Sequence, residues 1–197
     1  FCQKKFRNLI IVRLPSVFGP FLKKNFIFDL FNPIPMMLKK DKYNKILSHI
    51  PKIYRNNFKK YYDKKNSIFY LKKNFLKKNK PYKEIVNSLK KNNLQSSSFT
   101  NPVSSFQYYF LKNLWKDIFK ILNKNIKIIH FACEPIKAKT IHKKLLNNNM
   151  KKNTSFIYNA NMVSKYNKLW RSNNNYLYNK KTIIKQLLNF YKVKKLN

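Results

Sequence analysis

Paired lysines are the residues of this sequence whose type and spacing point most directly to chemistry. Lysine carries a point charge on a flexible stem, which suits contact with phosphate groups better than the reading of base edges. Such pairs recur along the whole chain, whereas a binding tail would concentrate them at one end. The pairs predict binding to the RNA backbone with little sequence preference, although any one pair could simply face solvent. The candidate RNA-binding residues are Lys23, Lys24, Lys39, Lys40, Lys59, Lys60, Lys64, Lys65, Lys72, Lys73, Lys77, Lys78, Lys143, Lys144, Lys151, Lys152, Lys194 and Lys195.

The overall charge supports a polyanionic partner. The 197 residues include 44 Lys and Arg against 6 Asp and Glu, a formal net charge of +38. Self-repulsion at this charge opposes compaction, so nucleic acid is the expected counterpart and an anionic membrane surface is the rival. The chain is also rich in Lys, Asn, Ile, Phe and Tyr, whose codons are A/T-rich. Mutational bias therefore explains Lys in place of Arg, but it does not by itself explain the scarcity of acids.

Aromatic side chains alternate with the lysines in the middle of the chain. Exposed rings could stack on unpaired bases. The alternative is that they form the core of their own lobe, which is the preferred interpretation for the Phe residues and an equal one for the Tyr residues. The residues concerned are Tyr54, Phe58, Tyr61, Tyr62, Phe69, Tyr70, Phe75 and Tyr82.

The few remaining polar side chains with catalytic potential are isolated from one another. We expect His130, inside an apolar strand, to be packed, and His142, on a basic helix, to face solvent. Asp117 and Glu134 are expected to act as internal salt-bridge partners or caps, because no two acids are near neighbours in the sequence. No spacing of His, Cys or acids indicates a metal site.

The sequence contains two cysteines and no recognisable targeting or membrane segment. Cys2 and Cys133 are far apart, which favours a reduced compartment over a disulfide framework. No apolar run reaches the roughly 18 residues that a membrane-spanning helix needs, and no signal peptide is recognisable.

The motifs of a nucleotide-dependent enzyme are missing. A G-x-G-x-x-G loop needs several glycines so that a helix N-terminus can approach a pyrophosphate, and this chain has one glycine, Gly19. Tyr61 and Lys65 spell a Tyr-x-x-x-Lys, which is expected by chance in a sequence so rich in both residue types. We therefore expect no cofactor and no catalysis by this chain alone.

Hydrophobic periodicity predicts the elements that must position these residues. The helix over residues 110–122 would turn Leu111, Leu114, Trp115, Ile118 and Leu122 inward. Residues 36–95 are the hardest to interpret and are expected to be partly irregular. The predicted elements are a buried, parallel strand at 9–12 that ends by Gly19-Pro20, a helix or turn at 21–31, a strand at 68–71, a helix at 81–89, the helix at 110–122, a strand at 126–132, and helices at 136–146 and 180–193.

Several of these segments together resemble the C-terminal part of the extended short-chain dehydrogenases, the NAD-dependent epimerase/dehydratase family. Residues 11–35 resemble that family's strand and loop after the catalytic helix, and residues 101–118 resemble a later helix entry. Residues 128–136 are similar to its last sheet strand, and residues 156–190, with Lys165-Tyr166 and Tyr176-Leu177-Tyr178, to its C-terminal segment. The resemblance implies a single incomplete Rossmann-like α/β domain over residues 1–197, with residues 36–100 as a less regular, Lys- and Asn-rich lobe.

Two hypotheses follow from the charge and the resemblance. The first is a non-catalytic protein of an organellar ribosome in the mitochondrial matrix, an enzyme remnant kept for its shape that contacts rRNA and neighbouring ribosomal proteins. The second is the C-terminal half of a split NAD-dependent epimerase or reductase, in which a partner chain supplies the glycine-rich loop and the Tyr-x-x-x-Lys.

Overall fold

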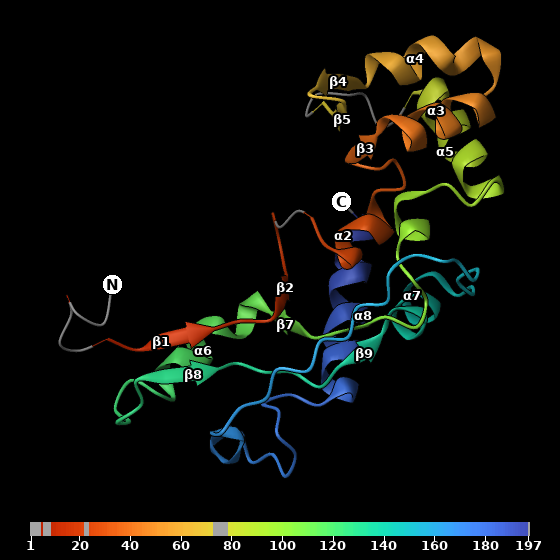
Figure 1. The fold of residues 1–197 in the computed structure, drawn as a ribbon. Coiled ribbons are helices and arrows are strands. Elements are labelled where there is room, and N and C mark those ends of the chain that lie inside the picture. Colours follow the sequence, from red (N-terminus) through yellow and green to blue (C-terminus); the bar gives the residue numbers. More distant parts are fainter. Residues whose placement is uncertain (1–4, 6–8, 22–23, 73–78, 197) are drawn as a thin grey trace. The chain divides into compact units, whose positions relative to one another are not determined.

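The computed structural model describes residues 5, 9–21, 24–72 and 79–196, with the side chains of 194–196 left out, and the chain is a mixed α/β protein (Figure 1). Its residues divide into two compact units. The first unit comprises Phe1–Lys23, Pro102–Met150 and Ile157–Asn197, and the second comprises Lys24–Asn101 and Lys151–Phe156. Each unit is described by itself.

Segments that are distant in the sequence are brought together in the first unit. Its elements, in chain order, are β1 (Ile11–Arg13), β2 (Ser16–Phe18), β6 (Ser105–Phe106), β7 (Tyr108–Phe110), η3 (Leu111–Asn113), α6 (Leu114–Phe119), β8 (Ile128–His130), β9 (Ile136–Lys137), α7 (Ala138–Leu146), η4 (Asn167–Trp170) and α8 (Lys180–Leu196).

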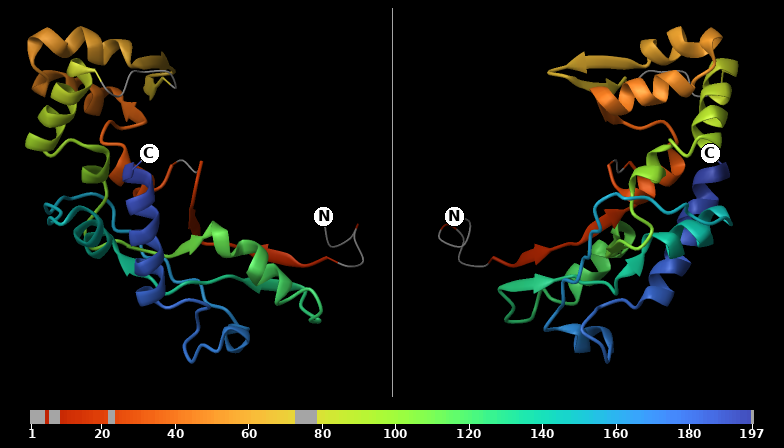
Figure 2. Two further views of the ribbon diagram at one scale, coloured as in Figure 1. Left: turned by 180° about the vertical axis from the view of Figure 1, so that it is seen from behind. Right: turned by 45° about the vertical axis from the view of Figure 1, so that its right-hand side comes forward.

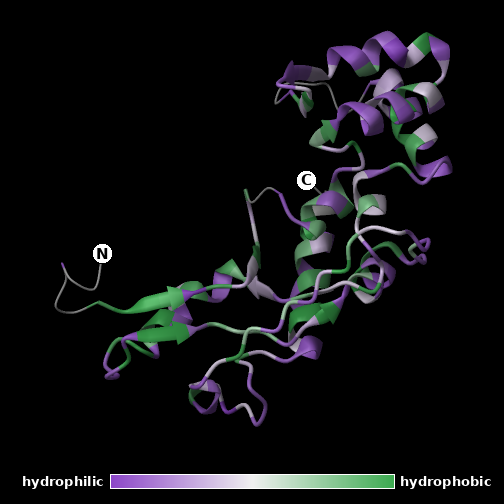
Figure 3. Cartoon of the chain, in the orientation of Figure 1, coloured by the Kyte–Doolittle hydropathy of each residue, from purple (hydrophilic) through white to green (hydrophobic). Residues whose placement is uncertain are grey.

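Parallel strand pairs form the centre of the first unit. β1 pairs with β8 in parallel, with Val12 opposite Ile129, and β2 pairs with β7 in parallel, with Val17 opposite Tyr109. The views in Figures 1 and 2 agree on the side-by-side course of β1 and β8, and Figure 3 shows that both strands are hydrophobic. The predicted parallel strand near the start of the chain is confirmed, although it covers residues 11–13 and is only partly buried. β6 and β9 form a short antiparallel pair.

The last two helices close the core of the first unit as the sequence predicts. α7 buries Ile141 and Leu145, and α8 buries Ile183, Leu187 and Tyr191. Burial of residues at spacings of three, four and seven fixes the rotation of each helix about its axis. α7 ends at Asn147, which adopts the left-handed conformation common after a helix C-terminus.

The orientation of α6 contradicts the sequence-based prediction. The helix covers Leu114–Phe119, which is shorter than the predicted 110–122, and it buries Asp117. Trp115 is 68% exposed, Phe119 60% and Leu122 51%, so Trp115 and Leu122 do not point inward as the apolar spacing suggested. Asp117 accepts hydrogen bonds from donors inside the unit, and satisfying these donors turns the side of the helix that carries Asp117 inward while Leu114 and Ile118 stay half-buried.

The second unit is a small α/β body built from neighbouring segments. Its elements are α2 (Phe26–Phe31), β3 (Met37–Lys39), α3 (Lys40–His49), η1 (Lys52–Tyr54), α4 (Arg55–Lys60), β4 (Tyr62–Lys65), β5 (Ile68–Leu71), α5 (Lys80–Lys91) and η2 (Ser96–Phe99). Residues 36–95, expected to be partly irregular, therefore form helices and strands over most of their described length.

A three-stranded antiparallel sheet organises the second unit. The strand order is β3-β5-β4, and β4 and β5 form a hairpin whose two-residue turn, Asn66-Ser67, has positive φ at both positions. Positive φ at both central residues is typical of the turn that matches strand twist. The predicted strand at 68–71 is confirmed, as is the helix at Pro81, which extends over Lys80–Lys91 and is capped by the Asn79 side chain.

Candidate functional site

The described lysines of the predicted RNA-binding set are all exposed. In Figure 3, α3 and α4 are coloured mostly as hydrophilic, which reflects their many polar residues. Lys23, Lys73, Lys77 and Lys78 lie outside the described residues, and nothing is described for the side chains of Lys194 and Lys195. The exposed members are Lys24, Lys39, Lys40, Lys59, Lys60, Lys64, Lys65, Lys72, Lys143, Lys144, Lys151 and Lys152.

Internal ion pairs neutralise little of this charge. Between described residues the structure contains two salt bridges, Lys72–Asp63 and Lys180–Glu134, each at 3.3 Å. Glu134 also accepts a hydrogen bond from the Lys180 backbone amide at the start of α8, which confirms its predicted role as an internal partner. Burial raises the pKa of Asp29 to about 7, so this acid is only partly ionised near neutral pH. The exposed lysines of the predicted set therefore remain available to an external anion, apart from Lys72.

The interleaved aromatic residues mostly form the core of the second unit. Phe58, Tyr61 and Tyr62 are buried, and the Tyr43 ring stacks on Phe69 with centroids 3.7 Å apart. Tyr54, Phe69 and Tyr82 pack against that core, Tyr70 is 39% exposed, and Phe75 lies outside the described residues. The core interpretation is thus confirmed for most of the set, and Tyr70 is the described member best placed to stack on a base.

The chance Tyr-x-x-x-Lys does not form a reactive pair. Tyr61 is 7% exposed in the core of the second unit, and burial is the main cause that raises the pKa of its hydroxyl. Lys65 is an exposed residue near the tip of the β4–β5 hairpin. A proton-transfer pair needs both groups at one accessible site, so Tyr61 and Lys65 do not form such a pair.

Asp117 is the centre of a buried hydrogen-bond network in the first unit. Its side chain is fully buried and accepts hydrogen bonds from the Tyr109 hydroxyl at 2.6 Å, the Tyr178 hydroxyl at 2.8 Å and Trp170 Nε1 at 2.8 Å. Burial is the main cause that raises the pKa of both tyrosines, and the Asp117 carboxylate raises it further. Asp117 is internal, but the prediction that it acts as a salt-bridge partner or cap is wrong, because its partners are neutral hydroxyl and indole donors.

Cys133 is structural. Its thiol is fully buried, and burial, followed by the nearby Asp117 charge, raises its pKa well above the usual range. A thiol that is neither accessible nor ionised is a poor nucleophile. Across residues 5, 9–21, 24–72 and 79–196 there is also no cluster of three or more His, Cys, Asp or Glu that could bind a metal ion.

An apolar surface on the first unit has no partner within the described residues. It consists of Trp115, Phe119 and Leu122 on and after α6, which lies beside β1 and β8 in Figures 1 and 2. β1 pairs with β8 along one edge, and among the described residues no strand occupies its other edge. Parallel sheets in α/β proteins are usually covered on both faces, and an open hydrophobic edge can accept another strand. We call these features together the open face.

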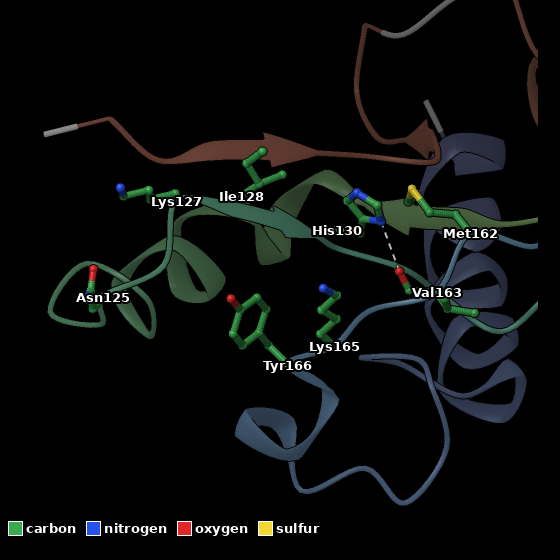
Figure 4. A pocket seen from close by; sticks show the side chains of 8 residues that line it. All are labelled: Asn125, Lys127, Ile128, His130, Met162, Val163, Lys165 and Tyr166. Atoms are coloured by element: carbon green, nitrogen blue, oxygen red, sulfur yellow. Dashed lines mark hydrogen bonds between the residues drawn. The ribbon is translucent and has the colours of Figure 1, made fainter. Parts of the chain in front are cut away.

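A cleft of about 770 Å³ lies between β8 and the segment 162–166 (Figure 4). Its lining residues are Asn125, Lys127, Ile128, His130, Met162, Val163, Lys165 and Tyr166. His130 is therefore a cleft residue, not the packed core residue that the sequence suggested. The Val163 carbonyl can only accept, so His130 Nδ1 donates to it at 3.0 Å, while Nε2 accepts from the Arg13 guanidinium at 3.4 Å. These contacts assign the ring to the neutral Nδ1–H form.

A second, more polar cleft of about 570 Å³ in the first unit concentrates cations. Lys116 of α6 and Lys120, the residue directly after that helix, line it together with Arg171, and the Lys120 ammonium lies 5.1 Å from the centre of the Trp170 ring. The cleft borders the start of α8, whose first amides are already bonded to Glu134 and Asn179. It offers the side-chain charge of Lys116, Lys120 and Arg171 to an anion.

Sequence reasoning missed the burial of His142. This residue is 4% exposed on α7 and contacts the Asn148 carbonyl at 3.1 Å, and burial lowers its pKa. The expectation that it faces solvent is wrong. Its position one residue after Ile141 places it close to the buried stripe of α7, which was the available signal.

The comparisons with known proteins add no relative. No family model, no curated protein and no solved structure matches this chain. None of the helices in the described part of the chain has the length and apolar character needed to cross a bilayer.

Proposed function

We propose that this chain provides the C-terminal part of an NAD-dependent epimerase or reductase of the extended short-chain dehydrogenase type. A partner chain would supply the nucleotide-binding half, with its glycine-rich loop and Tyr-x-x-x-Lys. The observation that carries the proposal is the open face: β1 leaves one edge unpaired by any described strand, and Trp115 and Phe119 are more than half exposed beside it. A hydrophobic strand edge next to an apolar helix face suits a further α/β segment that extends the sheet.

The pairing of β1 with β8 also supports this proposal. The resemblance to the family identified residues 11–35 with the strand and loop after the catalytic helix, and residues 128–136 with the last strand of the sheet. These two segments pair in parallel here, in the register Ile11 to Ile128. A parallel pair formed by strands more than a hundred residues apart requires a crossover connection, as in Rossmann-like folds.

NAD does not fit the residues of this chain alone. The single glycine, Gly19, packs against Leu111, where an added Cβ would lie 3.2 Å from the Leu111 Cβ. Its missing side chain therefore serves internal packing. The pyrophosphate site would have to come from the partner chain, and no catalytic step is assigned to the residues described here.

Purification of the tagged chain from the cells that naturally produce it tests the proposal. We expect an equimolar partner chain that carries G-x-G-x-x-G and Tyr-x-x-x-Lys, and NAD retained by the complex in a chromatographic assay. Phe119→Asp should lower partner recovery at least tenfold, because it places a charge in the apolar contact. Val193→Asp is the matched control, since Val193 is also 60% exposed but lies on α8.

Two results would overturn the proposal. One is a chain that is recovered without any partner of that description. The other is equal recovery of the partner by Phe119→Asp and Val193→Asp. Circular dichroism of both variants verifies that either loss is not due to unfolding, which is not expected at exposed positions.

The exposed lysines favour a second candidate, a non-catalytic RNA-binding protein of a mitochondrial ribosome. The specific observation is that, among the twelve described lysines of the predicted set, Lys72 is the one with a salt bridge to another described residue. Binding would be dominated by phosphate contacts, with counterion release and strong dependence on salt.

A salt titration of rRNA binding tests this candidate. We expect the chain to co-sediment with mitochondrial ribosomes at low salt and to be released at high salt. Replacing Lys59, Lys60, Lys64 and Lys65 by Gln should reduce the slope of log affinity against log salt by about 3. The same four positions changed to Arg retain the charge and should leave the slope unchanged. Indifference of the isolated chain to RNA near physiological salt would exclude the candidate.

A further inference from the structure

We propose that the cleft between β8 and the segment 162–166 binds a nucleoside monophosphate unit, either as a free nucleotide or as an unpaired nucleotide of an RNA strand. The site belongs entirely to the first unit and does not use the open face or the glycine-rich loop of a partner chain. It is therefore a ligand site beyond the proposed function, and it can be tested on this chain alone.

The size and composition of the cleft suit a small, partly apolar ligand. Its volume of about 770 Å³ lies within the roughly 300–1,000 Å³ that is usual for small-molecule sites. Ile128, Met162 and Val163 supply apolar surface, and Tyr166 supplies an aromatic ring. Ile128 and His130, two residues apart on β8, lie on the same face of the strand, opposite the buried Ile129.

The charges of the cleft select an anion. Lys127 and Lys165 are exposed cations from opposite walls, and none of the eight lining residues is acidic. Figure 4 shows Lys165 and Tyr166 rising from the segment 162–166 toward β8. Neither lysine has a salt bridge to a described residue, so a phosphate group would be the first counter-charge in the cleft.

His130 connects the two walls of the cleft. Its Nδ1–H donates to the Val163 carbonyl, and its Nε2 accepts from Arg13, so both ring nitrogens have partners within the chain. The ring therefore ties β8 to the segment 162–166.

The aromatic ring distinguishes a nucleotide from inorganic phosphate. Base stacking on an aromatic side chain is tolerant of base identity, since every base has a π-face. Asn125, at the opposite end of the cleft from Met162 in Figure 4, adds an amide that can both donate to and accept from a base edge. The cleft combines a lysine on each wall with an aromatic ring, and an inorganic phosphate ion would contact a lysine without using the ring.

Calorimetric titration of the purified chain with AMP, adenosine and inorganic phosphate near physiological salt tests the proposal. We expect AMP to saturate one site and to bind at least tenfold more tightly than either fragment. Lys127→Gln/Lys165→Gln should weaken AMP binding at least tenfold. Lys143→Gln/Lys144→Gln removes the same charge from exposed positions on α7 of the same unit, and should change the affinity less than twofold.

A second variant separates the ring from the charge. Tyr166→Ala should weaken AMP at least fivefold and leave phosphate unchanged. The proposal is overturned if the two double variants weaken AMP equally, or if phosphate binds as tightly as AMP, because either result reflects diffuse positive charge. Loss of partner-chain recovery in the Phe119→Asp experiment leaves these results unaffected, so the two proposals can fail separately.

Competition with a short oligoadenylate identifies the source of the ligand. An unpaired nucleotide of RNA is indicated if the oligomer displaces bound AMP at a lower concentration than unlabelled AMP does. This displacement should also be weaker in Lys127→Gln/Lys165→Gln than in Lys143→Gln/Lys144→Gln. An oligomer that fails to displace AMP indicates that the natural ligand is a free nucleotide, because the lysines then require a terminal phosphate.

Discussion

The two units of this protein solve the problem of building a core in different ways. The second unit packs aromatic rings from nearby segments, with Tyr43, Phe58 and Tyr62 in mutual contact. The first unit buries polar groups: Asp117 accepts from three donors, two of them more than fifty residues away. A ring cluster tolerates changes that conserve volume, whereas a hydrogen-bond network depends on the identity of each atom.

Gln107 extends this contrast within the first unit. It is 2% exposed, donates from Nε2 to the carbonyls of Cys133 and Met162, and accepts from the Met162 amide. One side chain thereby fixes the end of β8 and the segment that carries the cleft. The stability of the first unit therefore depends on a few buried polar atoms, whereas that of the second depends on the volume of its rings.

Removing a ring from the second unit should have the largest effect. Phe58 is fully buried, so Phe58→Ala should cost about 4 kcal/mol of unfolding free energy through lost burial and a cavity. Phe58→Leu, which conserves most of the volume, should cost less than half of that. Hydrogen exchange of amides in residues 40–65 measures both, and an equal cost for the two variants would remove the claim that volume dominates here.

Changing one atom of the first unit should have nearly the same effect. Asp117→Asn is almost isosteric, but it takes an acceptor from the buried donors of Tyr109, Tyr178 and Trp170, which should cost about 3 kcal/mol. Urea unfolding followed by tryptophan fluorescence measures it, because both tryptophans, Trp115 and Trp170, are in this unit. The control is Asp63→Asn, an exposed salt-bridge partner, which should cost less than about 1 kcal/mol. A negligible cost for Asp117→Asn would contradict the contrast.

Asp29 gives the second unit a pH dependence that follows from its burial. Its pKa is about 7 in the folded protein against 3.8 for an ordinary aspartate, so the folded state disfavours the charged form. Stability should therefore fall as the pH rises from about 4 to 7. Asp29→Asn should remove this slope. At pH 8 it should raise the free energy of unfolding of the second unit by about 2 kcal/mol, which is less than the pKa shift alone implies because a partly exposed group relaxes toward solvent. Parallel pH profiles for the two proteins would refute the assignment.

His142 should give the first unit a smaller dependence of the opposite sign. Burial lowers the pKa of His142 below its ordinary 6.5, so the unfolded state takes up a proton that the folded state resists. Stability of the first unit should fall as the pH falls through about 6.5, by less than about 1 kcal/mol. His142→Gln keeps an N–H donor for the Asn148 carbonyl and should flatten this decline in fluorescence-detected unfolding. His49→Gln, on the exposed end of α3, is the control.

Local sequence patterns predicted the elements whose formation depends little on distant parts of the chain. α5, α7 and α8 follow from apolar spacing and, for α5, from Pro81 in its first turn. The internal role of Glu134 followed from the scarcity of acids, whereas the neutral partners of Asp117 did not. The parallel β2–β7 pair and the cleft wall at 162–166 could not be predicted, because the residues that position them, such as Gln107, act across more than fifty positions of sequence.

The amino-acid sequence alone fixes the charge of this protein, its single glycine and the buried faces of α7 and α8. It could not determine which face of α6 points inward. Periodicity specifies which residues share a face, but the choice between faces depends on what the rest of the chain presents. The tertiary structure decided that choice by placing Tyr109, Tyr178 and Trp170 around Asp117, since buried donors without an acceptor would cost more than an exposed Trp115 and Phe119.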